Sequence, residues 1–207
     1  SDGNGGWYVG GQFTVQGLSN LVHILANNTI DLSFAPNPNS LVSALYLSGT
    51  TLYVGGSFTQ ISSTSQSYLA AIDPTTAIIQ GWSPNPDGAI NAIIKDGNTV
   101  YVGGSFTNIG GRENRYFASI DATTAVAIPS LSVSSTVGLI EQDVNNLYLG
   151  GSFSGASGYY TGNSALLSTT SDLPDFNFPI IGSGNITKSI SDGNGGWYVG
   201  GQFTVQG

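Results

Sequence analysis

Cysteine and methionine are absent from this 207-residue chain, and histidine occurs only once. Without cysteine there is no disulfide framework and no thiol chemistry, and one histidine leaves no pair of histidines for a metal site. Charged residues make up 8% of the chain, and the formal net charge is −8. This balance predicts no nucleic-acid partner, because a basic surface is missing. Membrane insertion is not expected either, because no run of about 18 apolar residues occurs.

The beginning of the chain lacks the marks of a translation start or a leader. Ser1 is not an initiator methionine, and neither a basic n-region nor an apolar h-region follows it. The surface must be covered largely by Ser, Thr, Asn, Gly and Gln. These features favour a mature or excised piece of a longer bacterial protein, located outside the cell or on its surface.

One string, Tyr-Val/Leu-Gly-Gly-x-Phe-Thr/Ser, occurs five times in the chain. Its tyrosines are spaced by 45, 48, 47 and 50 residues, at Tyr8, Tyr53, Tyr101, Tyr148 and Tyr198. A period of about 47 residues is typical of propeller blades and of two-helix repeats. Helix caps and a 3.6-residue apolar period are missing, so the pattern excludes the helical class.

Each repeat predicts four short strands. In the third repeat, residues 89–95 and 99–107 flank an Asp-Gly-Asn turn, and residues 115–121 follow a polar loop at 108–114. A weaker fourth strand is predicted at 125–130. Aligned on the tyrosine, the remaining predicted strands are residues 7–14, 21–26, 30–34, 41–47, 51–59, 68–73, 77–82, 137–142, 146–154, 164–168, 175–180, 186–190 and 197–204.

We therefore predict an all-β fold: a β-propeller-like array of four-stranded antiparallel blades in a single domain, residues 1–207. A closed four-blade ring and a segment of an open or larger array both fit the pattern. The approximate repeats are residues 1–40, 41–88, 89–136, 137–185, and 186–207 as the start of a next copy.

The second repeat resembles the kelch family, in which Gly-Gly after an apolar strand precedes a tyrosine and then a tryptophan. Gly55-Gly56, Tyr68 and Trp82 follow that order. The string YVGGSFT with the later LAAID also resembles the bacterial delta-60-type repeats. Both resemblances imply propeller-like blades and no particular activity. Departures from the kelch order occur at His23, Phe34, Ser130, Asn163 and Phe176.

The repeated string is interpreted as structural. A glycine inside a strand costs about 0.5–1 kcal/mol relative to alanine, so two in every repeat indicate close approach between crowded blades. The tyrosine and phenylalanine are five residues apart and point to opposite faces of a strand. Phosphate binding by the glycines would need a following helix, and none is predicted. The residues assigned to this role are Tyr8, Gly10, Gly11, Phe13, Tyr53, Gly55, Gly56, Phe58, Tyr101, Gly103, Gly104, Phe106, Tyr148, Gly150, Gly151, Phe153, Tyr198, Gly200, Gly201 and Phe203.

Candidate ligand-binding residues lie in two loops. Arg112 and Arg115 belong to the main charge cluster and would suit an acidic partner or a glycan. Tyr159 and Tyr160 form an aromatic pair between glycines and would suit a sugar or protein contact. Solvated loops are the alternative for both. No catalytic set, metal site or cofactor is predicted.

Several polar residues are expected to be structural. His23 is interpreted as a satisfied histidine within the fold. The Asp2-Gly3-Asn4 segment is similar to the start of a calcium loop, but turn chemistry also explains it. Asp73 and Asp121 are predicted to cap turns through side-chain hydrogen bonds to the backbone.

The two ends of the chain are identical over 17 residues: the sequence of residues 1–17, SDGNGGWYVGGQFTVQG, is repeated at residues 191–207. The internal repeats differ at most other positions, so a block of 190 residues was copied recently or designed. Neighbouring copies of the same block are the expected partners.

We expect a non-enzymatic extracellular module, structural or adhesive, of a bacterial surface protein or filament. A lectin-like propeller that binds carbohydrate or protein through its rim loops is the alternative, and a kelch-type enzyme is disfavoured by the single histidine.

Overall fold

All regular structure in the computed structural model is β-strand, over the described residues 1–144, 146–168, 174–175 and 177–205. Within these ranges there is no helix, and hence none that is long and apolar enough to span a membrane. Antiparallel hairpins lie at the two ends of the chain. The first hairpin pairs β1 (Trp7–Val15) with β2 (Leu18–Ile24), and the second pairs β19 (Ile181–Ser191) with β20 (Trp197–Val205).

Three larger antiparallel sheets lie between the terminal hairpins, one in each internal repeat. In each of them the strand with the Gly-Gly pair is central, with the preceding strand on one edge and a later strand on the other. The sheets comprise β3 (Val42–Ser48), β4 (Thr51–Gly56) and β7 (Leu69–Ile72); β8 (Ile90–Asp96), β9 (Thr99–Gly104), β12 (Phe117–Asp121) and β13 (Ala127–Ile128); and β14 (Val137–Asp143), β15 (Asn146–Gly151) and β18 (Ser164–Ser168).

The prediction of four strands in every repeat is wrong in detail. Among the described residues, only the sheet of the third repeat has four strands. Elsewhere the segment predicted as the fourth strand makes a single bridge, such as Ile72 with Ile79 or Ile24 with Ile30. Most of each of these segments runs as loop, with no further strand pairing beyond the bridge in the described ranges. The predicted strand at 175–180 falls partly outside the described residues, as does Phe176.

The predicted polar loop at 108–114 contains a small hairpin instead. Gly110 and Gly111 have positive φ values of 60° and 77°, which permit a two-residue turn. Corresponding hairpins occur in the second and fourth repeats. In the second, third and fourth repeats in turn, the hairpins pair β5 (Gln60–Ile61) with β6 (Thr64–Ser65), β10 (Asn108–Ile109) with β11 (Arg112–Glu113), and β16 (Gly155–Ala156) with β17 (Tyr159–Tyr160).

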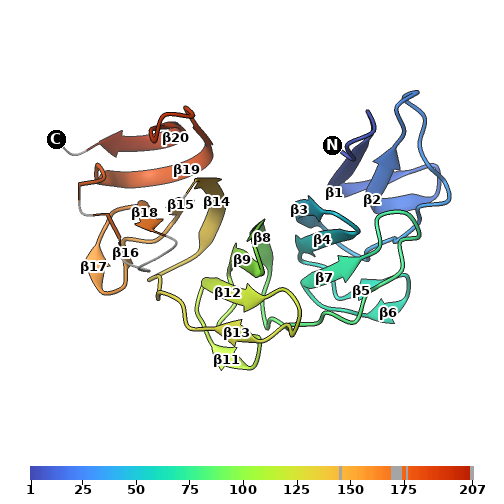
Figure 1. Cartoon of the computed structure of the whole chain (residues 1–207), viewed down its shortest axis with the longest axis horizontal. Coiled ribbons are helices and arrows are strands. Elements are labelled where there is room, and N and C mark those ends of the chain that lie inside the picture. The colour runs from blue at the N-terminus through green and yellow to red at the C-terminus, as the bar shows by residue number, and fades with distance from the viewer. Residues whose placement is uncertain (145, 169–173, 176, 206–207) are drawn as a thin grey trace.

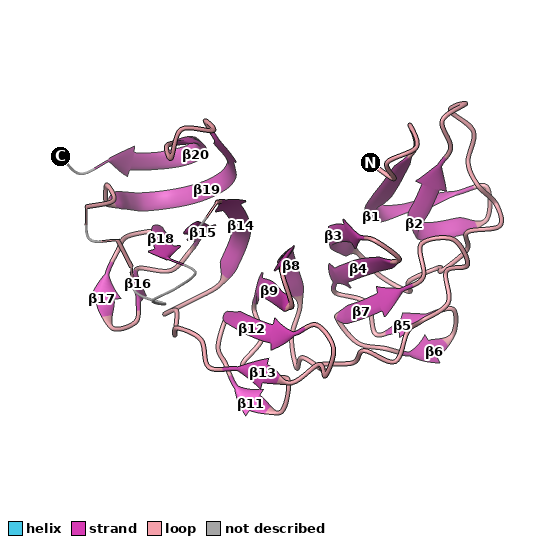
Figure 2. Ribbon diagram, in the orientation of Figure 1, coloured by secondary structure: helices cyan, strands magenta, loops and turns pink. Residues whose placement is uncertain are grey.

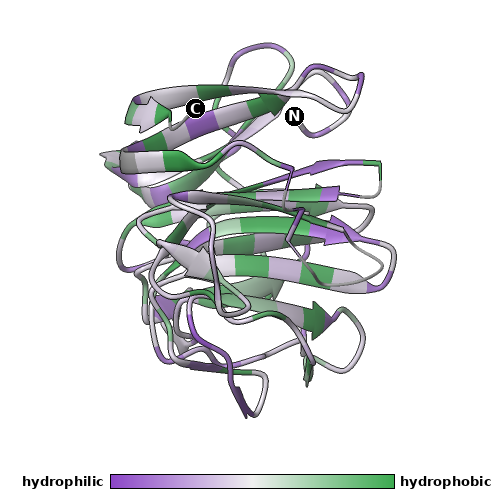
Figure 3. Ribbon diagram, turned by 90° about the vertical axis from the view of Figure 1, so that its left-hand side faces the viewer, coloured by the Kyte–Doolittle hydropathy of each residue, from purple (hydrophilic) through white to green (hydrophobic). Residues whose placement is uncertain are grey.

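The sheets follow one another along an arc (Figures 1 and 2). The first strand of each sheet neighbours the first strand of the next, so that β3, β8, β14 and β19 form one row, with β1 beside β3. The two terminal hairpins lie at opposite ends of the arc in Figure 1. Figure 3 shows that the apolar positions lie mostly in the strands and the hydrophilic ones mostly in the loops.

The hydrophobic core is divided into three layers, each between successive repeats. Leu21 and Phe34 of the first repeat pack with Phe58 of the second. The other layers continue this arrangement, with Tyr53 and Phe106 in the next one. Each buried aromatic ring contributes about 1.5–3 kcal/mol, so each repeat depends on its neighbours for stability.

Candidate functional site

The first glycine of each repeated string faces the first strand of the next repeat. A Cβ built on it would lie 2.5–3.1 Å from a β-branched side chain of that strand. We call this contact the glycine junction; its pairs are Gly10 with Val42, Gly55 with Ile90, Gly103 with Val137, and Gly150 with Ile186. Glycine is therefore required where one repeat packs on the next. Gly200 has no such neighbour among the described residues, since only Lys188 O lies nearby, at 3.9 Å.

The second position of each pair requires glycine because of a contact within its own sheet. A Cβ on Gly56 would overlap the carbonyl oxygen of Leu41, next to a bulge between Val42 and Ala44. Gly104, Gly151 and Gly201 meet the corresponding carbonyl in their own repeats. The expectation that both glycines serve contacts between blades is therefore wrong for the second one.

The tyrosine and the phenylalanine of each string contribute to different core layers. Tyr53 packs toward the third repeat, while Phe58 packs toward the first. Tyr101 and Phe106 repeat this division one sheet further along. The two faces of each central strand are thus covered by opposite neighbours, as the spacing of five residues predicts.

The predicted ligand residues lie on the small hairpins of successive repeats. Arg112 lies on β11 and borders an open cavity of about 620 Å³. Arg115 is exposed and binds Glu113 Oε1 through Nε and a terminal nitrogen, at 2.9 and 2.8 Å. Tyr159 and Tyr160 are exposed on β17 and border a separate cavity of about 410 Å³. The structure therefore places Arg112 and Tyr159 in corresponding positions of their hairpins, while Arg112 and the tyrosine pair border different cavities.

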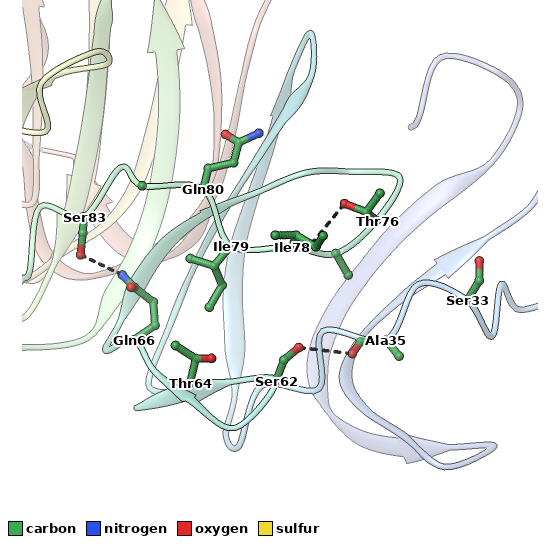
Figure 4. Close-up of a pocket in the computed structure, with 12 residues that line it drawn as sticks. Ser33, Ala35, Ser62, Thr64, Gln66, Thr76, Ile78, Ile79, Gln80 and Ser83 are labelled. Carbon is green, nitrogen blue, oxygen red and sulfur yellow. Dashed lines mark hydrogen bonds between the residues drawn. The ribbon is translucent and has the colours of Figure 1, made fainter.

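An open cavity of about 620 Å³, which the sequence did not predict, lies beside the hairpin β5–β6 (Figure 4). Hydroxyl and amide groups surround an exposed Ile78, among them Thr64, Gln66 and Thr76. Gln66 Nε2 donates to Leu69 O at 2.7 Å and to Ser83 Oγ at 3.4 Å, which orients this side chain. The sequence held one sign of this cavity. Thr76 and Ile78 of the second repeat recur as Thr124 and Val126 at the same places in the third repeat.

His23 lies between two carboxylates that the sequence did not bring together. Its Nε2 is 3.1 Å from Asp2 Oδ2, and its Nδ1 is 3.2 Å from Asp31 Oδ2. Tyr8 stacks on the imidazole, with ring centroids 4.5 Å apart. The carboxylates contact opposite edges of the ring and do not converge on one point. Accordingly, no cluster of acidic or histidine side chains is placed to hold a metal ion in the part of the chain described.

The hydrogen bonds of this cluster favour ionised carboxylates. The pKa of Asp2 is lowered by the backbone N–H of Asn4 and by His23. The pKa of Asp31 is lowered mainly by the hydroxyl of Ser33, with a smaller contribution from His23. The calcium-like segment at Asp2 is a turn, in which Asp2 Oδ1 accepts from the N–H groups of Asn4 and Gly6 at 2.7 and 2.8 Å.

The predicted turn caps at Asp73 and Asp121 are confirmed. Asp73 Oδ1 accepts from the N–H groups of Thr75 and Thr76, at 2.9 and 2.8 Å. Asp121 accepts from Thr123 and Thr124 in the same way. Both carboxylates have lowered pKa values because of these backbone hydrogen bonds.

Asp87 anchors the chain just after Phe106. It accepts hydrogen bonds from the N–H groups and side chains of Thr107 and Asn108, at 2.6–2.9 Å. Burial raises the pKa of the Asp87 carboxyl, but these hydrogen bonds outweigh burial and lower it well below its ordinary value. Asn39 occupies the corresponding place in the second repeat and accepts from Thr59 N and Gln60 N, without a charge.

We expect Asp87→Ala to destabilise the chain by about 1 kcal/mol at pH 7, because charged hydrogen bonds are lost. A folded-state pKa that is depressed adds stability above the unfolded-state value of about 3.9, and this stability is lost as the pH falls below it. The difference from the wild type should therefore shrink between about pH 4 and pH 2 in denaturant titrations. Asn39→Ala is the matched control, and its effect should not change with pH over this range. A pH-independent effect of Asp87→Ala would contradict the assignment.

Comparison with known proteins finds no matching family and no matching curated protein sequence. Among the solved structures that match is the crystal structure of the computationally designed Ika8 protein, at 13% identity and a TM-score of 0.46. The match covers 81% of this chain and 47% of that one, so this chain spans about half the length of the designed protein. The class defined by the fold itself is an all-β protein of antiparallel sheets.

Proposed function

We propose that the chain is a non-enzymatic structural or adhesive repeat module of an extracellular surface protein or filament. Its sheets act as the blades of a propeller-like array, in keeping with the kelch-like and delta-60-like strings. The observation that supports this best is the glycine junction, which recurs at four successive boundaries between repeats. A contact that repeats from unit to unit is what a linear array requires.

The same residues support an architectural role over a chemical one. The β-branched residue of each junction also pairs with the second glycine of its own sheet, as Ile90 pairs with Gly104. This side chain therefore contacts both its own sheet and the preceding one, alongside the rest of the core layer. The composition, rich in hydroxyl and amide side chains, suits an extracellular setting and a partner that is another copy of the repeat.

Chains that contain one, two or three copies of the 190-residue block in tandem test this proposal. We expect the maximum dimension measured by small-angle X-ray scattering to increase with each copy. The thermal midpoint should rise from one copy to two, because each new junction adds a stabilising interface. Copies that tumble independently, with an unchanged midpoint, would argue against a structural array.

Carbohydrate binding at the rim is a second candidate function. Cavities of about 620 Å³ occur in corresponding places in the second and third repeats, each with hydroxyl groups beside an exposed aliphatic side chain. On this alternative, a glycan array should give signals that fall at least about tenfold in Ile78→Asp. Val144→Asp is the control, because Val144 is 82% exposed and borders neither cavity. Absence of signals above background in the wild type would exclude this alternative.

A further inference from the structure

The terminal hairpins are complementary parts of one sheet. In the complete sheets the central strand pairs on both edges; Tyr101, for example, is opposite Ile94 on β8 and Ser119 on β12. The strands β1 and β20 have the same nine residues, WYVGGQFTV, but each has one partner among the residues that the structure describes. Within these residues β1 pairs with the strand that follows it, and β20 pairs with the strand that precedes it. Each hairpin therefore has the strand that the other lacks.

We infer that β19 and β20 of one copy and β2 of a second copy form one three-stranded sheet between copies. In the single chain β1 lies beside β2. In the joined sheet β20 of the neighbouring copy lies there instead. The inference rests on the proposed function and specifies its partner, which is a second copy of this chain. In the joined sheet Tyr198 would be opposite Ile190 of its own copy and His23 of the next, because Tyr8 is opposite His23 here.

Three features of β20 match what the second copy would supply. The junction glycine Gly200 has open space where Gly10 meets Val42. Asp192 forms the same turn as Asp2, accepting from Asn194 N at 2.8 Å and Gly196 N at 2.9 Å. The described residues provide no histidine for it, whereas Asp2 has His23.

The exposed apolar side chains at this end indicate that the face is covered in the assembly. Ile190 is 65% exposed, and Tyr198 is 69% exposed, while the corresponding tyrosines of the complete sheets, Tyr53, Tyr101 and Tyr148, are at most 9% exposed. Exchange of β1 for the neighbour's β20 keeps the number of strand ladders constant, and it uncovers Tyr8 as it covers Tyr198. The net gain therefore comes from covering Ile190 on β19, which has no counterpart beside β1 within the described part of the chain. A second copy is the matching occupant, because β20 repeats every residue of β1.

The first experiment uses the wild-type chain and a synthetic peptide of residues 18–48, LSNLVHILANNTIDLSFAPNPNSLVSALYLS, which includes Val42 of β3. This peptide supplies β2, His23 and Asp31, and it should bind to the free edge of β20. Binding measured by fluorescence anisotropy should weaken at least about tenfold in Gly200→Val, because the valine would meet Val42 of the peptide, as a Cβ on Gly10 meets Val42 in this chain. A wild-type chain that does not bind the peptide, or binds it as well after Gly200→Val, would overturn the inference.

The second experiment uses the matched glycines of the two identical strands. Gly10→Val places side-chain atoms against Val42 of β3 and should displace β1 from its place beside β2 and β3, which β20 of a second copy, with Gly200, can then take. Analytical ultracentrifugation should then show concentration-dependent association through β20, reversed by an excess of the peptide of residues 191–205. The double variant Gly10→Val, Gly200→Val should associate at least about tenfold more weakly. Equal association of the single and double variants would overturn the inference. The proposed function would still stand in that case if tandem copies of the block raised the thermal midpoint.

Discussion

Gly104→Ala is expected to destabilise the chain by at least about 3 kcal/mol, because the new Cβ would overlap the carbonyl oxygen of Ala89. The atom in the way belongs to the backbone, which cannot rotate aside as a side chain can. That backbone is held by the bulge between Ile90 and Ala92, and Ile90 is fully buried in the core. Thermal unfolding followed by circular dichroism should show a midpoint about 6–12 °C lower than that of the wild type.

Gly11→Ala is the matched control, since Gly11 has the same place in the repeated string. A Cβ on Gly11 would meet only the ring of Phe13, at 3.0 Å, because β1 has no preceding strand in this chain. We expect a loss of less than about 1 kcal/mol, since an aromatic ring at a chain end can shift. Similar losses at both positions would mean that the bulge carbonyl is not the reason for the second glycine.

Phe106→Ala is expected to cost about 3–5 kcal/mol, the usual range for truncating a fully buried phenylalanine. Phe106 is completely inaccessible and lies in the core layer between the second and third repeats, with Tyr53 and Ile109. The cavity left behind would weaken both sheets that border this layer, since neither has another core on that side. Urea denaturation measures the loss.

Phe203→Ala provides the comparison within the same string. Phe203 lies on β20 and is only partly buried, whereas Phe106 is fully buried. Its truncation should cost no more than about 1 kcal/mol. If the two variants lost similar stability, the phenylalanines would not be acting as contacts between repeats, and the proposed array would lose its main energetic support.

Much of the strand pattern was predictable because it is local. Residues 89–95 were predicted as a strand and Ile90–Asp96 is one, while residues 164–168 match β18. The alternation of apolar residues and the Asp-Gly-Asn turn act over a few residues, so the sequence contains them directly. The fourth strand was predicted correctly only in part: β13 forms within residues 125–130, whereas residues 77–82 meet β7 at Ile79 alone, because an edge strand depends on whether a neighbour extends to meet it.

The candidate site was less predictable than the strands. The sequence contained Asp2, His23 and Asp31, but the cluster needs the register of β1 on β2 and a bridge from Ile24 to Ile30 to bring them together. The open cavities also arise between segments far apart in the sequence, such as Ser33 and Ser83. Arg112 and Tyr159 as ligand contacts stay predictions.

The sequence by itself determined the period, the strand content and the places that require glycine, because these follow from local sterics and hydrogen bonding. Only the tertiary structure decided which edge of a strand is paired. The nine residues WYVGGQFTV pair with the following strand as β1 and with the preceding strand as β20. The reason is physical: a strand has two hydrogen-bonding edges with the same sequence, and the available neighbours determine which edge is used.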